Sequence, residues 1–418
     1  MRTPCARWLR SSAGGIVIAS LVTCLFGVAK AATPPSQITI GTLYASSGTF
    51  AVASQAEFQG LKYWANGVNK TGGVFVKAFD KKIPVKIVAY DDQSSTSTAT
   101  TLYNQLITQN HVDVLVADFG SVLTSVAIPL AAEHHMLLID PTGSGSNFFK
   151  HKTDYLADVS IPSSSIWPIP LGKFLVAKNI KRVAILYDSN DFDASQANTL
   201  KSVLTKSGIS PVYFHGVPTD ESNYSILLHS IAAQHPDALL EFGYNPNDIA
   251  FLRDLSGSGL HFNMVFTVFP GQLLGLIEKN VGTAALDYTY TYPTPPLVKY
   301  NKVDLGENTA TFVKDFERAE HAKPNFLDAA GYNTGLIIQA MLGKAGQFNQ
   351  LAFHQALMNI SGTTTTLLGQ FKINTDGAQL GELLPVAQLQ PSGKGIKIAV
   401  VYPPNKANGK AIYPAPQQ

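Results

Sequence analysis

Short apolar runs along the chain alternate with longer stretches in which apolar residues recur every three or four positions. The runs predict strands at Ile38–Tyr44, 83–90, 112–117 and 136–139. The periodic stretches predict helices between them, over 58–68, 98–109 and 123–131. Strands that are almost wholly apolar and are separated by helices are typical of a parallel sheet covered on both faces, so the pattern predicts an α/β fold.

The pattern pauses over 141–165, which is rich in Gly, Ser and Pro, and then begins again. The second set predicts strands at 183–187, 212–215, 238–242 and 264–267, with helices near 194–207, 221–234 and 246–256. Two successive sets predict two similar lobes. A Tyr-, Thr- and Pro-rich segment at 288–296 is typical of a crossing between lobes. After it we expect helices at 308–320, 326–343 and 350–359, strands at 370–373 and 396–401, and a loose tail from Pro403.

The first 31 residues have the features of a secretory signal peptide. Three arginines precede an apolar stretch at 14–28, and Ala29-Lys30-Ala31 follows it. A basic start, a short apolar middle and an A-x-A ending predict export and cleavage, and the stretch is too short for a comfortable membrane span. Lipid attachment at Cys24 is the minor interpretation, because Thr23 before it is bulky and the downstream cleavage site is better.

Composition narrows the classes of function. The 418 residues are 45% hydrophobic and 14% charged, with 22 Phe and 16 Tyr, which allows large cores and excludes wholesale disorder. Cleavage after residue 31 removes four Lys/Arg, no acid and both Cys, which leaves 387 residues with a formal charge of −2. A disulfide scaffold and a strongly basic nucleic-acid binder are therefore excluded, and we expect a soluble exported protein.

Motifs for catalysis and metal binding are incomplete. The chain has no G-x-x-x-x-G-K-[ST] phosphate loop, and Gly143-Ser144-Gly145 completes neither a G-x-S-x-G nucleophile elbow nor a G-x-G-x-x-G dinucleotide loop. His134 and His135 are adjacent, so on a helix they diverge by roughly 100° and favour a helix C-terminus over a metal site. Asp91 and Asp92 end a strand, where they could do acid–base work or, more ordinarily, cap the next helix. We expect no enzymatic activity, no cofactor and no metal.

Small polar residues gather where predicted strands pass into helices. The junctions are 46–49 (Ser-Ser-Gly-Thr), 119–121 (Phe-Gly-Ser) and 141–144 (Pro-Thr-Gly-Ser). Ligands of open α/β sheets bind beyond the carboxyl ends of the strands, and a helix that begins at Ser121 adds its positive end. The junctions therefore indicate a cradle for an anion or carboxylate. The alternative is that Ser121 caps its helix and the glycines make turns.

A series of short motifs runs in order from Ile38 to Val401. They are 38–41 (Ile-Thr-Ile-Gly), 47–48 (Ser-Gly), 57–60 (Glu-Phe-Gln-Gly), 69–74 (Asn-Lys-Thr-Gly-Gly-Val), 90–92 (Tyr-Asp-Asp), 120–121 (Gly-Ser), 139–141 (Ile-Asp-Pro), 329–332 (Ala-Ala-Gly-Tyr), 369–371 (Gly-Gln-Phe) and 376–377 (Asp-Gly). In the order, spacing and extent of these motifs, and in having a leader, the chain resembles the type I periplasmic solute-binding proteins. Within these it is most similar to the leucine/isoleucine/valine-binding family of ABC importers.

The resemblance implies two Rossmann-like lobes with parallel sheets, joined by a three-segment hinge. It places the N-terminal lobe at 32–161 and 292–367, the C-terminal lobe at 162–291 and 368–402, and a loose tail at 403–418, after the signal peptide at 1–31.

The resemblance also implies a ligand site between the lobes. Hydroxyl residues aligned with Ser121 and Ser144 hold the ligand carboxylate in the family, assisted by backbone at Gly120 and Thr142. Aromatic residues of the second lobe, here Phe192 and Tyr244, cover the ligand on closure. An aromatic or apolar ligand body would suit a set of rings that could equally belong to the core: Phe119, Phe192, Tyr244 and Phe269.

The chain departs from the amino-acid-binding members at the positions that hold the ligand's ammonium group. Their carboxylates would fall near Ser163 and Val268, where this chain has no acid. A buried ammonium without a countercharge is strongly disfavoured, so we expect an aromatic or branched carboxylic acid, or an amide, rather than an amino acid. In another register Asp158, Asp191 or Asp193 would supply the countercharge.

These inferences lead to one function and three alternatives. The expected function is that of a monomeric periplasmic receptor that delivers a small organic ligand to an inner-membrane ABC permease and has no nucleic-acid partner. A branched-chain or other amino-acid-binding protein of the same family and a periplasmic ligand sensor of the same fold are alternatives. A secreted hydrolase is the third, and it lacks an assembled set of nucleophile, base and orienting group.

Overall fold

The computed structural model describes residues 33–299, 302–393 and 395–416. The predicted signal peptide at 1–31, with Cys24, lies outside these residues. From Pro35 onward the chain forms one compact unit. Within the described part of the chain, none of the helices combines the length and the apolar character that a membrane span needs.

The first sheet is entirely parallel, with the strand order β4-β1-β5-β6-β7. Its strands are β1 (Ile38–Tyr44), β4 (Val85–Asp91), β5 (Val114–Val116), β6 (Leu138–Asp140) and β7 (Leu156–Asp158). Helices α1 (Ala51–Asn69), α2 (Thr96–Thr108) and α3 (Gly120–Glu133) connect them. In sequence terms this is the order 2-1-3-4-5 of a doubly wound fold, which places ligands beyond the carboxyl ends of the strands.

Successive side chains along each strand point to opposite faces of the sheet, so the core of this lobe has two layers. In β5, Val114 and Val116 belong to one apolar cluster, which includes Trp64 of α1. Leu115 belongs to the other cluster, with Tyr103 of α2. Because successive side chains of a strand point to opposite faces, the apolar run of β5 requires helices on both sides, as the sequence predicted.

The second sheet repeats this order and then extends it. Its parallel strands run in the order β9-β8-β10-β11-β12, and β15 and β16 add two antiparallel strands beyond β12. The strands are β8 (Val183–Asp188), β9 (Tyr213–Val217), β10 (Ala238–Phe242), β11 (Val265–Phe266), β12 (Tyr290–Thr291), β15 (Val386–Ser392) and β16 (Gly395–Tyr402). The helices are α4 (Pro168–Ala177), α5 (Asp191–Lys206), α6 (Ser225–Ala232), α7 (Asn245–Gly257) and α8 (Leu274–Val281).

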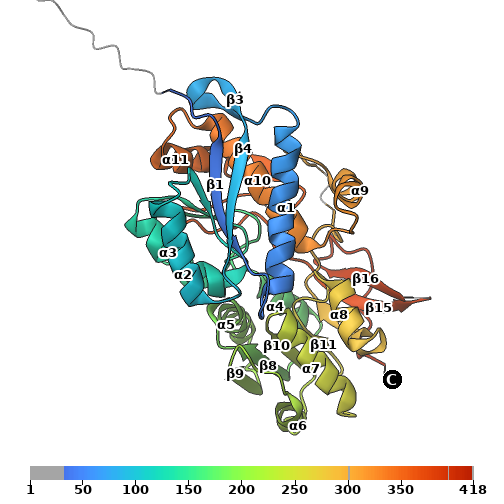
Figure 1. Ribbon diagram of the computed structural model, residues 1–418. Coiled ribbons are helices and arrows are strands. Elements are labelled where there is room, and N and C mark those ends of the chain that lie inside the picture. Colours follow the sequence, from blue (N-terminus) through green and yellow to red (C-terminus); the bar gives the residue numbers. More distant parts are fainter. Residues whose placement is uncertain (1–32, 300–301, 394, 417–418) are drawn as a thin grey trace, which may run out of the picture. The chain divides into compact units, whose positions relative to one another are not determined.

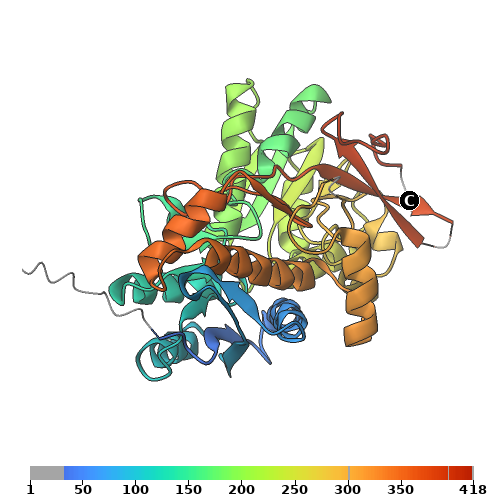
Figure 2. The ribbon, with the colours of Figure 1, turned by 90° about the horizontal axis from the view of Figure 1, so that it is seen from above.

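The chain passes between the two sheets three times, after β7, after β12 and before β15. Between the second and third passages lie α9 (Thr309–Glu320), α10 (Phe326–Lys344) and α11 (Gln350–Ile360), orange in Figures 1 and 2. Helix α10 packs along α1, and α11 packs on α10. Small hairpins and 3-10 turns complete the fold: β2 (Val74–Val76), β3 (Lys81–Ile83), β13 (Thr364–Thr366), β14 (Gly369–Phe371), η1 (Lys77–Phe79), η2 (Ser146–Phe149) and η3 (Ala284–Leu286).

The prediction of a loose tail from Pro403 is wrong for residues 403–416. The Ile412 carbonyl accepts hydrogen bonds from the Tyr290 hydroxyl (3.1 Å) and the Gln388 amide (2.8 Å), and the Ile412 N–H donates to Gln388. The Ala415 N–H donates to the carbonyl of Asn263. These bonds tie the segment to the second sheet, although its Pro-rich composition gives no periodic pattern.

Candidate functional site

The residues singled out in the sequence gather at the carboxyl ends of strands from both sheets. Gly120 and Ser121 follow β5, Thr142 and Ser144 follow β6, Phe192 follows β8, Tyr244 follows β10 and Phe269 follows β11. Ring contacts and hydrogen bonds join the two groups, so the first and second lobes meet here. This is the place that the doubly wound order assigns to a ligand.

A chain of hydrogen bonds shapes the first-lobe side of the site. The Gly120 N–H donates to the Thr142 hydroxyl (3.0 Å), and that hydroxyl donates to Glu57 of α1 (2.7 Å). Glu57 is buried, and burial raises the pKa of its carboxyl well above the usual value. The Gly120 N–H and the Thr142 proton are therefore already engaged, so these two groups position the loops.

Ser121 joins the two lobes. Its N–H donates to the Tyr244 hydroxyl (3.1 Å), and its own hydroxyl accepts from the Gly145 N–H (2.9 Å). The residue before helix α3 is Phe119, whose side chain makes no capping bond. Ser121 is thus not a simple helix cap but holds the 142–145 loop. A ligand oxygen can reach the Ser121 N–H only if the Tyr244 hydroxyl moves.

Ser144 is fully buried and its hydroxyl has no hydrogen-bond partner among the described residues. Its carbonyl accepts two bonds of 2.8 Å, from the N–H and the hydroxyl of Ser164. The backbone is therefore fixed while the hydroxyl is unpaired. Leaving a buried hydroxyl unpaired costs about 1–3 kcal/mol, so Ser144 has a donor to offer, although it does not itself line the cavity between the lobes.

Aromatic rings from both lobes surround Tyr244. Its ring centroid lies 5.3 Å from Phe50, 6.0 Å from Phe119, 5.3 Å from Phe192 and 6.2 Å from Phe269. Burial is also the main reason why the pKa of the Tyr244 hydroxyl is raised, so this group stays protonated.

The rings enclose a small cavity between the lobes. Its lining residues are Phe119, Gly120, Thr142, Ile161, Trp167, Phe192, Tyr244, Phe269, Gln272 and Phe326. The free space is about 10 Å³, roughly that of one water molecule. None of these lining residues is charged, so the cavity is neutral and mostly apolar. A larger ligand can enter only if the rings or the lobes move apart.

The carboxylates considered as ammonium partners do not line this cavity. Asp191 accepts from the Asn147 N–H of the first lobe (2.8 Å). Asp193 is buried and accepts from the Asn190 side-chain amide (2.8 Å). Asp158 is buried with both oxygens unpaired at the end of β7. No carboxylate therefore lines the cavity, although Asp193, whose Oδ1 is unpaired, lies near enough to Tyr244 to contribute to the raised pKa of its hydroxyl.

Sequence reasoning missed Trp167 and Gln272 as site residues. Trp167 precedes α4, a helix that was not predicted, and its ring lies 5.1 Å from Phe192. Gln272 follows β11, so its place beyond the carboxyl end of a strand was a signal that could have identified it.

The other motifs have ordinary structural roles. Asp91 accepts from the Ser46 and Gln93 N–H groups, and Asp92 accepts from the Ser94 N–H, so both hold turns. His134 follows α3 as its C-cap, as the sequence favoured. Over the residues that the structure describes, no group of three or more His, Cys, Asp or Glu could hold a metal.

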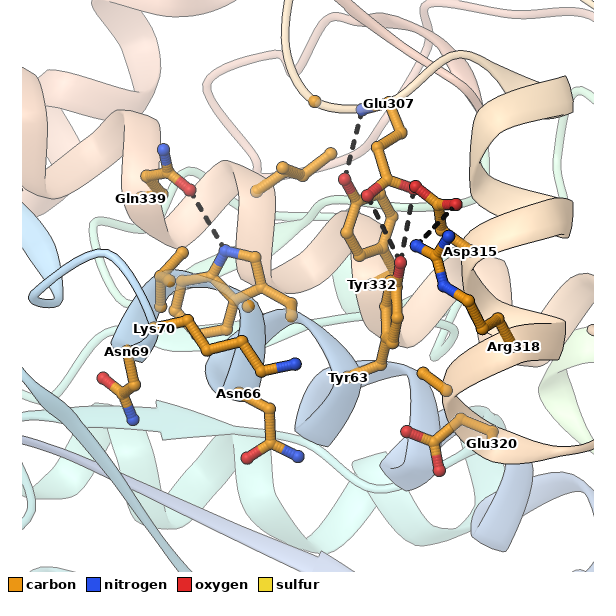
Figure 3. Close-up of a pocket in the computed structure, with 16 residues that line it drawn as sticks. Tyr63, Asn66, Asn69, Lys70, Glu307, Asp315, Arg318, Glu320, Tyr332 and Gln339 are labelled. Carbon is orange, nitrogen blue, oxygen red and sulfur yellow. Dashed lines mark hydrogen bonds and ion pairs between the residues drawn. The ribbon is translucent and has the colours of Figure 1, made fainter.

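A much larger pocket of about 1060 Å³ lies in the first lobe, away from this site (Figure 3). It is lined by α1, α9, α10 and the segment before α9. Figure 3 shows that several of its polar groups bond to one another: the Tyr63 hydroxyl donates to Glu307, the Glu307 N–H donates to the Tyr332 hydroxyl, and Arg318 pairs with Asp315. No lining residue has a buried side-chain polar atom without a partner in the described structure. The interlobe cavity has one, on Gln272, and is the better candidate.

Comparisons with known proteins agree with this geometry. The profile of a family described as periplasmic binding protein matches residues 37–394. The leucine-specific-binding protein of Salmonella typhimurium is 23% identical over 249 residues, 60% of this chain and 63% of that protein. The Leu/Ile/Val-binding protein of Escherichia coli K12 is 22% identical over 223 residues, 53% of this chain and 59% of that protein. The match thus spans about three fifths of the length of these relatives.

Solved structures share the fold. A leucine binding protein from Thermotoga maritima superposes with a TM-score of 0.74 at 16% identity, covering 88% of this chain and 99% of that one. A solute binding protein of an ABC transporter from R. palustris, in complex with benzoate, gives 0.71 at 17% identity, with 87% and 95% covered. At such identities the likeness establishes the two-lobed type I fold and not the ligand.

Proposed function

Because this chain belongs to the periplasmic binding protein family, in its leucine/isoleucine/valine-binding branch, we propose that it is the solute-binding component of an ABC importer. The family is one of solute-binding proteins, periplasmic or extracellular in location. On this proposal the chain is exported after loss of its leader and acts as a monomer. It binds one small ligand between its lobes and passes it to a membrane permease.

The proposed ligand is a carboxylic acid with an aromatic or branched body and no α-amino group. The observation that carries this proposal is the uncharged interlobe cavity, which is walled by aromatic rings and has no carboxylate. A buried ammonium would lack a countercharge there. The R. palustris protein, which has the same fold, was solved with benzoate, a ligand of the proposed kind.

The carboxylate is proposed to bind at the N-terminus of α3. The Ser121 N–H already donates to one oxygen, that of Tyr244, and the buried Ser144 hydroxyl has a free proton to donate. A helix N-terminus also favours negative charge. A ligand carboxylate would displace the Tyr244 hydroxyl and pair with both groups.

A matched panel of ligands tests the proposal. We would measure thermal shifts with 3-phenylpropionate against phenylalanine and with 4-methylpentanoate against leucine, and then titrate the better binders by calorimetry. We expect the larger shift from each acid without the amine. Larger shifts from the amino acids would contradict the ligand class and make Asp158, Asp191 or Asp193 the candidate ammonium partner.

The cradle is tested separately. Ser144→Ala removes the hydroxyl donor, and Ser121→Ala keeps its N–H but releases the Gly145 N–H of the 142–145 loop. The double variant is expected to weaken binding of the preferred acid at least about tenfold, since one hydrogen bond to a charged group contributes about 1.5–3 kcal/mol. A melting temperature close to that of the wild type would establish that the variant is folded. Unchanged affinity would place the carboxylate elsewhere.

A further inference from the structure

Gln272 presents a buried, unpaired hydrogen-bond acceptor at the interlobe cavity. Gln272 lines the cavity with Tyr244 and Phe269, and the residue is 2% exposed. The amide nitrogen donates to the carbonyl of Val268 (3.3 Å), while Oε1 has no partner among the described residues. No other residue that lines the cavity has such an atom in the described structure.

The hydrogen bond to Val268 fixes which end of the amide is free. If the amide were turned over, two oxygens would face each other at this distance, so the nitrogen must point to Val268 and Oε1 must remain the unpaired atom. A buried acceptor without a partner is costly. Since none of the described residues donates to Oε1, a ligand that enters the cavity can supply the missing donor.

We propose that Gln272 selects ligands that carry a neutral O–H or N–H donor in addition to their carboxylate, such as a hydroxy acid or an acid amide. The inference rests on the proposed function and refines its ligand class. A neutral donor fits better than an ammonium group, because an ammonium has three N–H donors and a full charge, whereas Gln272 offers one amide oxygen. The hydroxyl or amide would pair with Oε1 while the carboxylate binds at α3.

Pairs of ligands that differ by one hydroxyl test this role by calorimetry. The pairs are benzoate with 4-hydroxybenzoate, and 3-phenylpropionate with 3-phenyllactate. The wild type is expected to bind the hydroxylated member of at least one pair about three- to tenfold more tightly, which is the range of one neutral hydrogen bond. In Gln272→Met, which keeps the length but loses the acceptor, the preference should fall below about twofold while affinity for the plain acid is retained.

Gln196 supplies a matched control. It is a fully buried glutamine whose amide donates to the carbonyl four residues earlier (3.4 Å, Phe192) and whose Oε1 is also unpaired, but it does not line the cavity. Gln196→Met removes the same chemical groups and should leave the hydroxyl preference unchanged. An equal loss of preference in both methionine variants would overturn the assignment to Gln272.

A second variant keeps the test independent of how well methionine packs. Gln272→Glu has the same shape and adds a carboxylate that can pair with an ammonium group. The affinity for phenylalanine, relative to the affinity for 3-phenylpropionate, should therefore rise by at least about threefold. Wild-type protein that binds the plain acids without any hydroxyl preference would overturn the role of Gln272 and leave the proposed function standing. Binding of amino acids in place of every acid would overturn the proposed function itself.

Discussion

Buried carboxyl groups without cationic partners are the most unusual feature of this protein at the scale of single residues. They include Glu57, Asp118, Asp140, Asp158, Asp188, Asp193, Glu241 and Asp248. None of the described lysines or arginines is buried with them. Burial therefore raises the pKa of each group, to about 7 for Asp140. Near neutral pH the folded chain holds protons that the unfolded chain releases.

These groups predict that stability falls as the pH rises. An aspartate has a pKa of about 3.9 when unfolded, so a folded-state pKa of about 7 means that the proton is bound more tightly in the folded chain. The stabilising contribution is fully present below about pH 4 and is lost as the pH rises through about 7. By calorimetry we expect a melting temperature at least about 5 °C higher at pH 5 than at pH 8.

Asp140→Asn isolates one of these groups. Asp140 accepts from the Thr142 and Gly143 N–H groups through Oδ1, and asparagine keeps that acceptor without a titrating proton. The variant should lose part of the difference between pH 5 and pH 8. A wild-type melting temperature that increases from pH 5 to pH 8 would contradict the prediction.

At the scale of elements, the contact between α1 and α10 helps to position the loops of the candidate site. Gly60 of α1 lies against the backbone of α10, where a Cβ would overlap the carbonyl oxygen of Asp328. Gly331 of α10 lies equally close to the carbonyl of Glu57. Because Glu57 holds the Thr142 hydroxyl, the spacing of these two helices positions the 142–145 loop.

Two alanine variants in the same helix test this contact. Gly60→Ala must push the helices apart and should lower the free energy of unfolding by about 1–3 kcal/mol or more. Gly67→Ala lies where a Cβ meets nothing within 4 Å, so it should be neutral or stabilise by up to about 1 kcal/mol through helix propensity. Urea denaturation compares them. Equal effects from both variants would mean that α1 and α10 can separate without cost.

The elements also indicate how far sequence reasoning reaches. Strands β1 and β10 were predicted with their observed bounds, because each is a short β-rich segment with polar, Gly or Pro residues close to both ends. Helix α4 was missed because Pro168 and Pro170 interrupt its first turn, and β12 was missed because it has two residues in a Tyr-, Thr- and Pro-rich segment. Tertiary packing, and not a local sequence pattern, determines whether such short elements form.

The candidate site, too, was predicted from the sequence only in part. Ser121 and Ser144 were found because they stand at strand ends, and Tyr244 was implied by the family resemblance. The structure brings the three together, while their roles in binding remain predictions. The bond from the Ser121 N–H to Tyr244 and the free acceptor of Gln272 depend on which groups meet in space. No spacing along the chain reveals them.

At the scale of the whole molecule, the structure holds its two lobes together across the site with few polar contacts. The Asn147 N–H of the first lobe donates to Asp191 of the second (2.8 Å), and the Ser121 N–H donates to Tyr244 (3.1 Å). Three chain segments cross between the lobes and can act as a hinge. On the proposed function a ligand needs more space than the cavity offers, so we expect binding to be coupled to opening and closing, and contacts such as Asn147–Asp191 to favour the closed form.

Asp191 therefore provides a test of closure that does not involve ligand contacts. Asp191→Ala removes the acceptor of the Asn147 N–H, so a smaller fraction of molecules should be closed, and apparent affinity falls in proportion to that fraction. We expect a loss of about two- to tenfold, the same for benzoate and 4-hydroxybenzoate, with a larger radius of gyration in small-angle scattering at equal ligand saturation. Asp191→Asn retains an acceptor and should behave nearly as the wild type. If affinity instead changes unequally between acids and amino acids, Asp191 contacts the ligand directly and acts as the ammonium partner.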